Sequence, residues 1–150
     1  MTFEDLLESR CVASKEAKPY LVDTRLPAEM GSITVARGLA RRVLDECDYR
    51  GRHEDVLLVV SELVTNALVH GDGSPALRLE GTMTHIRIEV SDSGPALPEP
   101  REPGPASGWG LHVVRLLSTG WGISPGERGK VVWCELAARL APLQVRPSEA

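Results

Sequence analysis

The sequence predicts an α+β protein, a two-layer α/β sandwich in which about three helices cover one face of a mixed, mainly antiparallel sheet. Segments with strand period and segments with helix period are interspersed along the chain. The later strand segments come in pairs joined by short turns, which is typical of antiparallel hairpins. The chain has 150 residues, enough for one domain with a substantial core. We expect this domain at 19–138, between tails at 1–18 and 139–150.

The first half of the chain is expected to supply one strand and two helices. Residues 20–26, YLVDTRL, alternate in hydropathy as a strand does. Pro27 is expected to open a helix, because proline is tolerated in a first turn, and apolar residues recur at helical spacing as far as Cys47. A second helix is expected from about Arg52 to His70, before the helix stop GDG. Its predicted core stripe is Val56, Val60, Leu63, Ala67 and Leu68.

The second half is expected to supply two hairpins and a helix. ALRLEG (76–81) and HIRIEVSD (85–92) alternate in hydropathy and are joined by a short turn. Residues 95–107 contain five prolines and predict a loop that is functional or mobile. A short helix is expected at 110–119, followed by the strands WGIS and KVVWCELA (130–137).

Composition and charge exclude several classes of protein. The net charge of -4 gives no general attraction to nucleic acid, and the 4% aromatic content offers no stacking platform for single strands. Cys11, Cys47 and Cys134 lack the spacing of metal ligands and are interpreted as reduced thiols of a cytoplasmic protein. The acidic N-terminus lacks the apolar region of a signal peptide, and no apolar run reaches transmembrane length. We therefore expect no direct contact with nucleic acid or membrane.

Glu62 and Asn66 are two polar residues inside the apolar run VLLVVSELVTNALV. Residues four apart lie on one face of a helix, so this helix turns a polar face toward something specific. A capping or interhelical hydrogen bond would explain the pair. A metal or phosphate site with Glu62 as a base would also explain it, because an unpaired buried carboxylate is costly.

Two further polar motifs follow. Asp92-Ser93-Gly94 ends a predicted strand, where it would serve as an ordinary turn or accept a hydrogen bond from a ligand amine. Gly108 and Gly110 precede a predicted helix, where exposed backbone N–H groups form an anion site, although such pairs also occur in plain loops. The sequence contains no P-loop, no GxSxG nucleophile elbow, no HExxH and no EF-hand.

Together the three motifs resemble those of the GHKL ATPase superfamily, which includes histidine kinase catalytic domains, gyrase-type ATPases, Hsp90 and MutL. SELVTNALVHG resembles its N box, DSG its first glycine box and SGWGL its second. The short single-domain form and the spelling ELVTNALVHG are most similar to the anti-sigma-factor serine/threonine kinases. The resemblance covers about residues 20–137 and implies the Bergerat ATP-binding fold.

The resemblance implies roles for individual residues. Asn66 would hold Mg²⁺ on the ATP phosphates, and Glu62 would position or deprotonate the attacking hydroxyl. Asp92 would accept from the adenine amino group, with Gly94 beside the base. Gly108 and Gly110 would wrap the phosphates. Residues 95–107 would form the nucleotide lid, and Leu111 would pack under it. We assign Lys130 to the surface.

The resemblance implies an ATP- and Mg²⁺-dependent protein serine/threonine kinase. Such a protein sequesters a sigma factor, phosphorylates an anti-sigma-factor antagonist, and can form a homodimer. A non-catalytic module that only sequesters a partner is the main alternative, favoured by the prolines of the lid and by Trp109. A detached histidine kinase domain ranks lower, because residues 1–18 are too short for a helix pair with a phospho-acceptor histidine.

Overall fold

The computed structural model describes residues 19–93, 109–125 and 129–139. In chain order, these residues form β1 (Tyr20–Arg25), α2 (Ser32–Glu46), α3 (His53–His70), β2 (Ala76–Gly81), β3 (His85–Asp92), α4 (Trp109–Leu117), β4 (Gly120–Pro125) and β5 (Lys130–Ala137). The predicted lid at 95–107, with Gly94 and Gly108, lies outside the described residues, as do the first tail and nearly all of the second.

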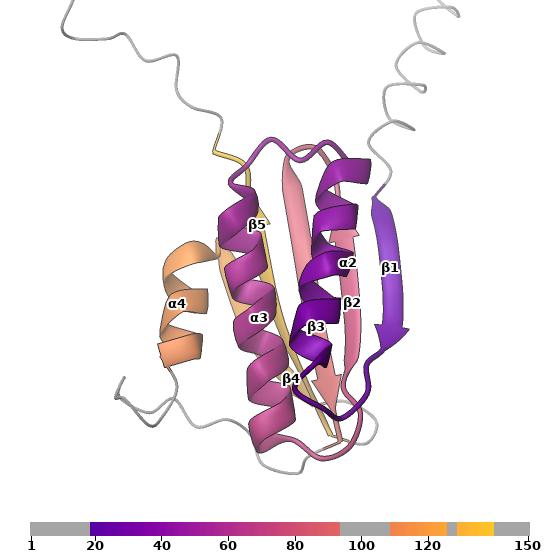
Figure 1. The fold of residues 1–150 in the computed structure, drawn as a ribbon. Coiled ribbons are helices and arrows are strands. Elements are labelled where there is room, and N and C mark those ends of the chain that lie inside the picture. The colour runs from indigo at the N-terminus through magenta and orange to yellow at the C-terminus, as the bar shows by residue number, and fades with distance from the viewer. Residues whose placement is uncertain (1–18, 94–108, 126–128, 140–150) are drawn as a thin grey trace, which may run out of the picture.

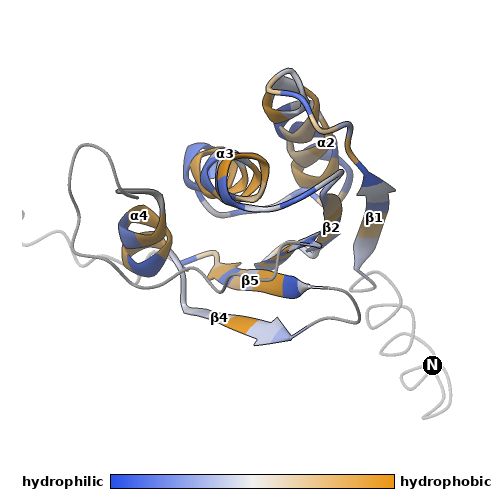
Figure 2. Ribbon diagram, turned by 90° about the horizontal axis from the view of Figure 1, so that it is seen from below, coloured by the Kyte–Doolittle hydropathy of each residue, from blue (hydrophilic) through white to orange (hydrophobic). Residues whose placement is uncertain are grey.

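The described strands form one sheet in the order β1-β2-β3-β5-β4, and all four pairings between neighbours are antiparallel. Figure 1 shows α2 and α3 lying side by side across one face of this sheet, with α4 next to α3. Viewed along the layers in Figure 2, the helices lie on one side of the sheet and the other side is open. The predicted two-layer α+β sandwich is confirmed, and its sheet is antiparallel throughout the described strands.

The core lies between the helices and the sheet because each strand turns alternate residues toward the helices. Along β2 and β3 the residues at every second position are buried, and the same holds along β5. Register sets these apolar rows beside one another: Leu79 is opposite Ile88, and Ile88 is opposite Cys134. The helices complete the core with Ala36, Ala40, Val43, Leu44, Val56, Val59, Val60, Leu63, Val64 and Ala67.

The first helix begins at Ser32, so the prediction that Pro27 opens it was wrong. Residues 27–31 form a turn, in which the Pro27 carbonyl accepts the Glu29 N–H at 2.8 Å and the Ser32 hydroxyl at 2.6 Å. The second helix, α3, matches its prediction to within one residue at its start. Its stripe is wider than predicted, because Val59 and Val64 are also buried, whereas Leu68 is only partly buried.

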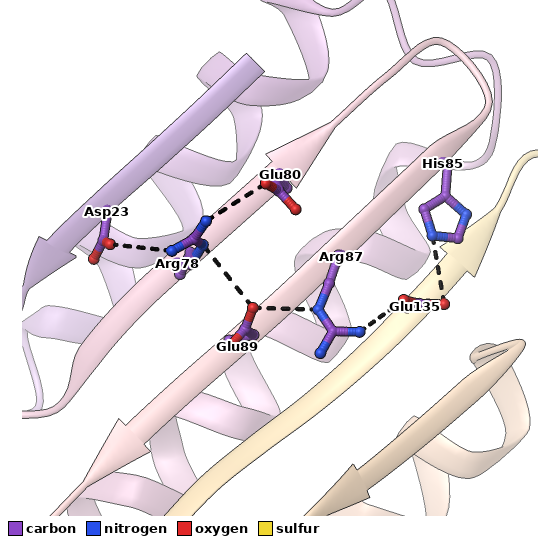
Figure 3. Close-up of polar contacts among 7 residues, drawn as sticks. All are labelled: Asp23, Arg78, Glu80, His85, Arg87, Glu89 and Glu135. Carbon is purple, nitrogen blue, oxygen red and sulfur yellow. Dashed lines mark hydrogen bonds and ion pairs between the residues drawn. The ribbon is translucent and has the colours of Figure 1, made fainter. Parts of the chain in front are cut away.

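The open face of the sheet carries a row of charged side chains that runs across four strands, as Figure 3 shows. Arg87 donates to Glu135 at 2.7 Å and to Glu89 at 3.2 Å, and its guanidinium lies 4.6 Å from the centroid of the Trp133 ring. Arg78 lies between Asp23 and Glu89 in the same row. Partly exposed pairs of this kind stabilise little individually, so the row chiefly keeps this face solvated.

Among residues 19–93, 109–125 and 129–139, no helix is long and apolar enough to cross a membrane.

Candidate functional site

Glu62 and Asn66 lie half-buried on α3, the helix that packs between α2 and α4. Their neighbours Ser61 and Thr65 are satisfied within the helix, since each hydroxyl donates to a carbonyl one turn earlier, at 2.8 and 2.6 Å. Between described residues, however, no hydrogen bond or ion pair involves the side chain of Glu62 or Asn66. The described residues therefore contain no capping or interhelical hydrogen bond from either side chain. A carboxylate and a carboxamide remain on one helix face, with their acceptor oxygens available to a ligand.

Asp92 ends β3 and turns its carboxylate toward the helix layer, where the side chain is 2% exposed. Lys130, the first residue of β5, lies opposite it in the sheet register. The Lys130 ammonium Nζ lies 3.3 Å from Asp92 Oδ1, so the two side chains form a buried ion pair.

The assignment of Lys130 to the surface was wrong, because its side chain is 5% exposed. The reason is the alternation along β5, where Lys130 shares the inward face with Val132, Cys134 and Leu136. In the sequence KVVWCEL, Cys134 and Leu136 flank the charged Glu135, and a period of two carried back from them places Lys130 on the same face.

Two glycines hold the backbone close to Asp92. A Cβ atom at Gly71, the residue that ends α3, would lie 2.7 Å from the Asp92 carboxyl carbon and 2.5 Å from the Ala67 carbonyl oxygen. A Cβ atom at Gly129 would collide with the Asp92 carbonyl oxygen and lie 2.7 Å from the Ser93 Cα. The end of α3 therefore lies close to the Asp92 carboxylate, and the residue before β5 lies close to the Asp92 backbone, because neither Gly71 nor Gly129 has a side chain.

We expect Gly71→Ala to lower the free energy of unfolding by about 1–3 kcal/mol, because the added methyl group forces α3 away from Asp92. Chemical denaturation measures this change. Gly38→Ala in α2 is the matched control, since a Cβ there meets nothing within 4 Å. That change is expected to raise the free energy of unfolding by about 0.5–1 kcal/mol, because alanine favours a helix interior. Equal effects of the two substitutions would contradict the close approach at Gly71.

Helix α4 carries two of the predicted site residues. Gly110 lies in its first turn, and Leu111 is half-buried in the next position. The helix packs against α3, and Val114 is its fully buried anchor in the core. Gly94 and Gly108 lie outside the described residues.

The placed residues follow one another along α3. With about 1.5 Å of rise per residue, Asn66 lies about 7 Å and Glu62 about 13 Å along the helix axis from Gly71, the residue next to Asp92. The carboxylate of Asp92, which belongs to β3, therefore lies next to the C-terminal end of α3, and the carboxamide of Asn66 and the carboxylate of Glu62 follow along the helix.

The described residues contain no group of three or more His, Cys, Asp or Glu side chains that could hold a metal ion. A cation near Asn66 would therefore take most of its ligands from water and from a bound molecule. Mg²⁺ accepts this, because it keeps several waters and is commonly held by one or two protein oxygens together with substrate phosphates. The single carboxamide at Asn66 fits such an ion.

The two described cysteines, Cys47 and Cys134, are not candidate nucleophiles. Burial raises the pKa of the Cys134 thiol to about 12, and burial also raises the pKa of Cys47. Reactive cysteines need a lowered pKa, because the thiolate is the nucleophile. Thiol chemistry at these two positions is therefore disfavoured.

Most of the chain matches the model of a known protein family. Residues 26–135 match the family model of the histidine kinase-like ATPase domain. The chain belongs to this family. The matched segment contains the whole of α2, α3, β2, β3, α4 and β4 and most of β5, and the resemblance stated from the three motifs is confirmed.

A solved structure shares the fold. It is the crystal structure of the RsbU and RsbW domains of Rv1364c from Mycobacterium tuberculosis, with a TM-score of 0.56 and 21% sequence identity. The superposition covers 80% of this chain and 32% of that one, so the chain spans about a third of that structure's length. At this identity the likeness concerns the fold alone. No curated protein matches the sequence.

Proposed function

We propose that this protein is an ATP-binding anti-sigma factor with serine/threonine protein kinase activity. Membership of the histidine kinase-like ATPase family supports nucleotide binding. The observation that carries the proposal is the half-buried face of α3. There the side chains of Glu62 and Asn66 have no partner among the described residues, whereas the neighbouring hydroxyls of Ser61 and Thr65 donate hydrogen bonds within the helix. The carboxylate and the carboxamide on this half-buried helix face offer acceptor oxygens to a ligand.

The order of groups along α3 supports a nucleotide with its base at the C-terminal end of the helix. Asp92 would accept a hydrogen bond from the adenine amino group. Gly71 has no side chain, so the site would be narrow at the end that holds the base. Asn66 comes next and would hold Mg²⁺ through its side-chain oxygen. When bound, that ion neutralises charge on the phosphate oxygens.

Glu62 lies farthest along the helix from Asp92, where the hydroxyl of a protein substrate would reach the terminal phosphate. Its carboxylate would take the proton from a serine or threonine hydroxyl while the oxygen bonds to the γ-phosphorus and ADP departs. A base must lie within hydrogen-bond reach of that proton, and the half-buried position of Glu62 allows this.

Two protein partners are proposed with this activity, a sigma factor and the antagonist protein that receives the phosphate. The motif spelling SELVTNALVHG supports them, because it is most similar to the anti-sigma-factor kinases. The net charge of -4 supports a role on proteins rather than on nucleic acid. Cytoplasmic location and a homodimer belong to the same proposal.

Calorimetric titration of ATP and ADP, with and without Mg²⁺, tests nucleotide binding directly. The wild type is expected to bind both nucleotides, and binding of ATP is expected to strengthen with Mg²⁺. Absence of binding under both conditions would overturn the proposed function.

We expect Asn66→Ala to remove most of the strengthening of ATP binding by Mg²⁺, because the substitution deletes the protein's oxygen ligand. Binding measured without the ion should change by less than about threefold, since Asp92 is untouched. Thr65→Ala, one position earlier on α3, is the matched control, because the Thr65 hydroxyl donates within the helix. Equal loss with and without Mg²⁺ in Asn66→Ala would contradict the assignment.

A further inference from the structure

The ion pair between Asp92 and Lys130 differs from the others in the described part of the chain. Its side chains are 2% and 5% exposed, whereas in every other ion pair between described residues both side chains are at least 29% exposed. The two residues are direct neighbours across the ends of β3 and β5, and both face the helices.

Stability alone does not explain a pair of this kind. Removing two charges from water costs several kcal/mol for each ion, and an apolar pair of similar volume is often as stable or more stable. The strands themselves provide the comparison, because the next inward pair on β3 and β5 is Val90 opposite Val132. The charged pair at the strand ends therefore calls for a role in the site.

Lys130 controls what Asp92 can offer to a ligand. An ionised carboxylate only accepts hydrogen bonds, and the Lys130 ammonium lies against one of its two oxygens, Oδ1. A carboxylate in a dry site without a cation nearby takes up a proton instead. It then carries an O–H donor in addition to its acceptors.

The two forms of Asp92 suit different purines. A carboxylate that only accepts matches the 6-amino group of adenine, which is a donor. A protonated carboxyl group also matches the 6-oxo group of hypoxanthine or guanine, which is an acceptor. The charge of Lys130 removes the second possibility.

We propose that Lys130 is a positioning residue that sets base specificity: it holds Asp92 as an oriented acceptor and thereby selects a 6-amino purine over a 6-oxo purine. This inference rests on the proposed binding of ATP at Asp92 and deepens it. Asp92 touches the base, and Lys130 acts through Asp92.

The test compares ATP with inosine triphosphate, which carries the same phosphates and a 6-oxo group in place of the 6-amino group. Calorimetry measures both affinities on the wild type and on Lys130→Met, at a temperature where circular dichroism shows each protein folded. The wild type is expected to prefer ATP by at least about tenfold, the effect of one hydrogen bond to a charged group. Lys130→Met is expected to bind ATP about tenfold more weakly and to bring the ratio of the two affinities close to one.

Arg87→Met is the matched control, because it breaks the ion pairs of Arg87 with Glu89 and Glu135 on the opposite face of the sheet (Figure 3). It should leave the ratio of ATP to inosine triphosphate affinity unchanged. If Lys130 had only a structural role, Lys130→Met would lower stability and leave that ratio of affinities unchanged.

The outcomes separate the two proposals. Absence of ATP binding to the wild type would overturn the proposed function together with this inference. Normal ATP binding to the wild type, with an unchanged ratio in folded Lys130→Met, would overturn only the inference. If Lys130→Met does not fold, the double variant Asp92→Asn with Lys130→Gln replaces it, since it leaves no unpaired buried charge. The amide that replaces the Asp92 carboxylate offers both a donor and an acceptor, so the ratio of ATP to inosine triphosphate affinity should again fall. An unchanged ratio would overturn the inference.

Discussion

Asp92→Ala is expected to lower the free energy of unfolding by about 3–5 kcal/mol, because it leaves the buried Lys130 ammonium without its carboxylate partner. The two side chains are 2% and 5% exposed, so water does not replace the lost contact. In the protein that remains folded, affinity for both ATP and ADP should fall by about tenfold to a hundredfold, since one hydrogen bond to a charged group is lost. Denaturant titration measures the first effect and calorimetry the second.

Asp23→Ala is the control for this substitution, because Asp23 also forms a cross-strand ion pair, with Arg78 at 3.8 Å on the open face. Its side chain is 58% exposed, so its loss should change the free energy of unfolding by no more than about 1 kcal/mol. Nucleotide affinity should stay at the wild-type value. Wild-type affinity in Asp92→Ala would refute the assignment of Asp92 to the base.

Glu62→Gln is expected to slow transfer of the γ-phosphate to an antagonist protein by about a hundredfold to ten-thousandfold, because the amide cannot take the proton of the attacking hydroxyl. Affinity for ATP should stay within about twofold of the wild type, since Glu62 lies at the far end of the helix face from Asp92. Transfer of labelled phosphate from ATP to candidate antagonist proteins measures the rate.

Glu54→Gln is the matched control on the same helix, because Glu54 lies in the first turn of α3 with its side chain 85% exposed. Its rate of transfer should equal that of the wild type. An unchanged rate in Glu62→Gln would exclude Glu62 as the base. A wild type that binds ATP and transfers no phosphate to any candidate would favour the alternative in which the protein only sequesters a partner.

Much of the fold was predictable because periodicity is a local property of the sequence. The strands at 76–81 and 85–92 and the helix at 53–70 repeat their apolar residues with clear periods of two and 3.6, and the structure has them where they were expected. The start of α2 was not predictable from the same pattern. Pro27 is compatible with a first turn of helix, but the hydrogen bonds accepted by its carbonyl close a separate turn there.

The candidate site was also only partly predictable from the sequence. Glu62 and Asn66 were recognisable because both belong to one helical turn and one contiguous motif. The environment of Asp92 was not, because Gly71, Gly129 and Lys130 come to it from two other elements. Lys130 is 38 positions after Asp92 in the sequence, and no pattern within either segment indicates that the two residues form an ion pair.

By itself, the sequence determined which segments become helices and strands and which short motifs connect the chain with the histidine kinase-like ATPases. These properties depend on residues that are near one another along the chain. The tertiary structure alone decided that β3 and β5 are neighbours in a register that sets Asp92 opposite Lys130. Strand order and register depend on how the sheet packs against α2 and α3. The charged neighbour of Asp92 is therefore a property of the tertiary structure.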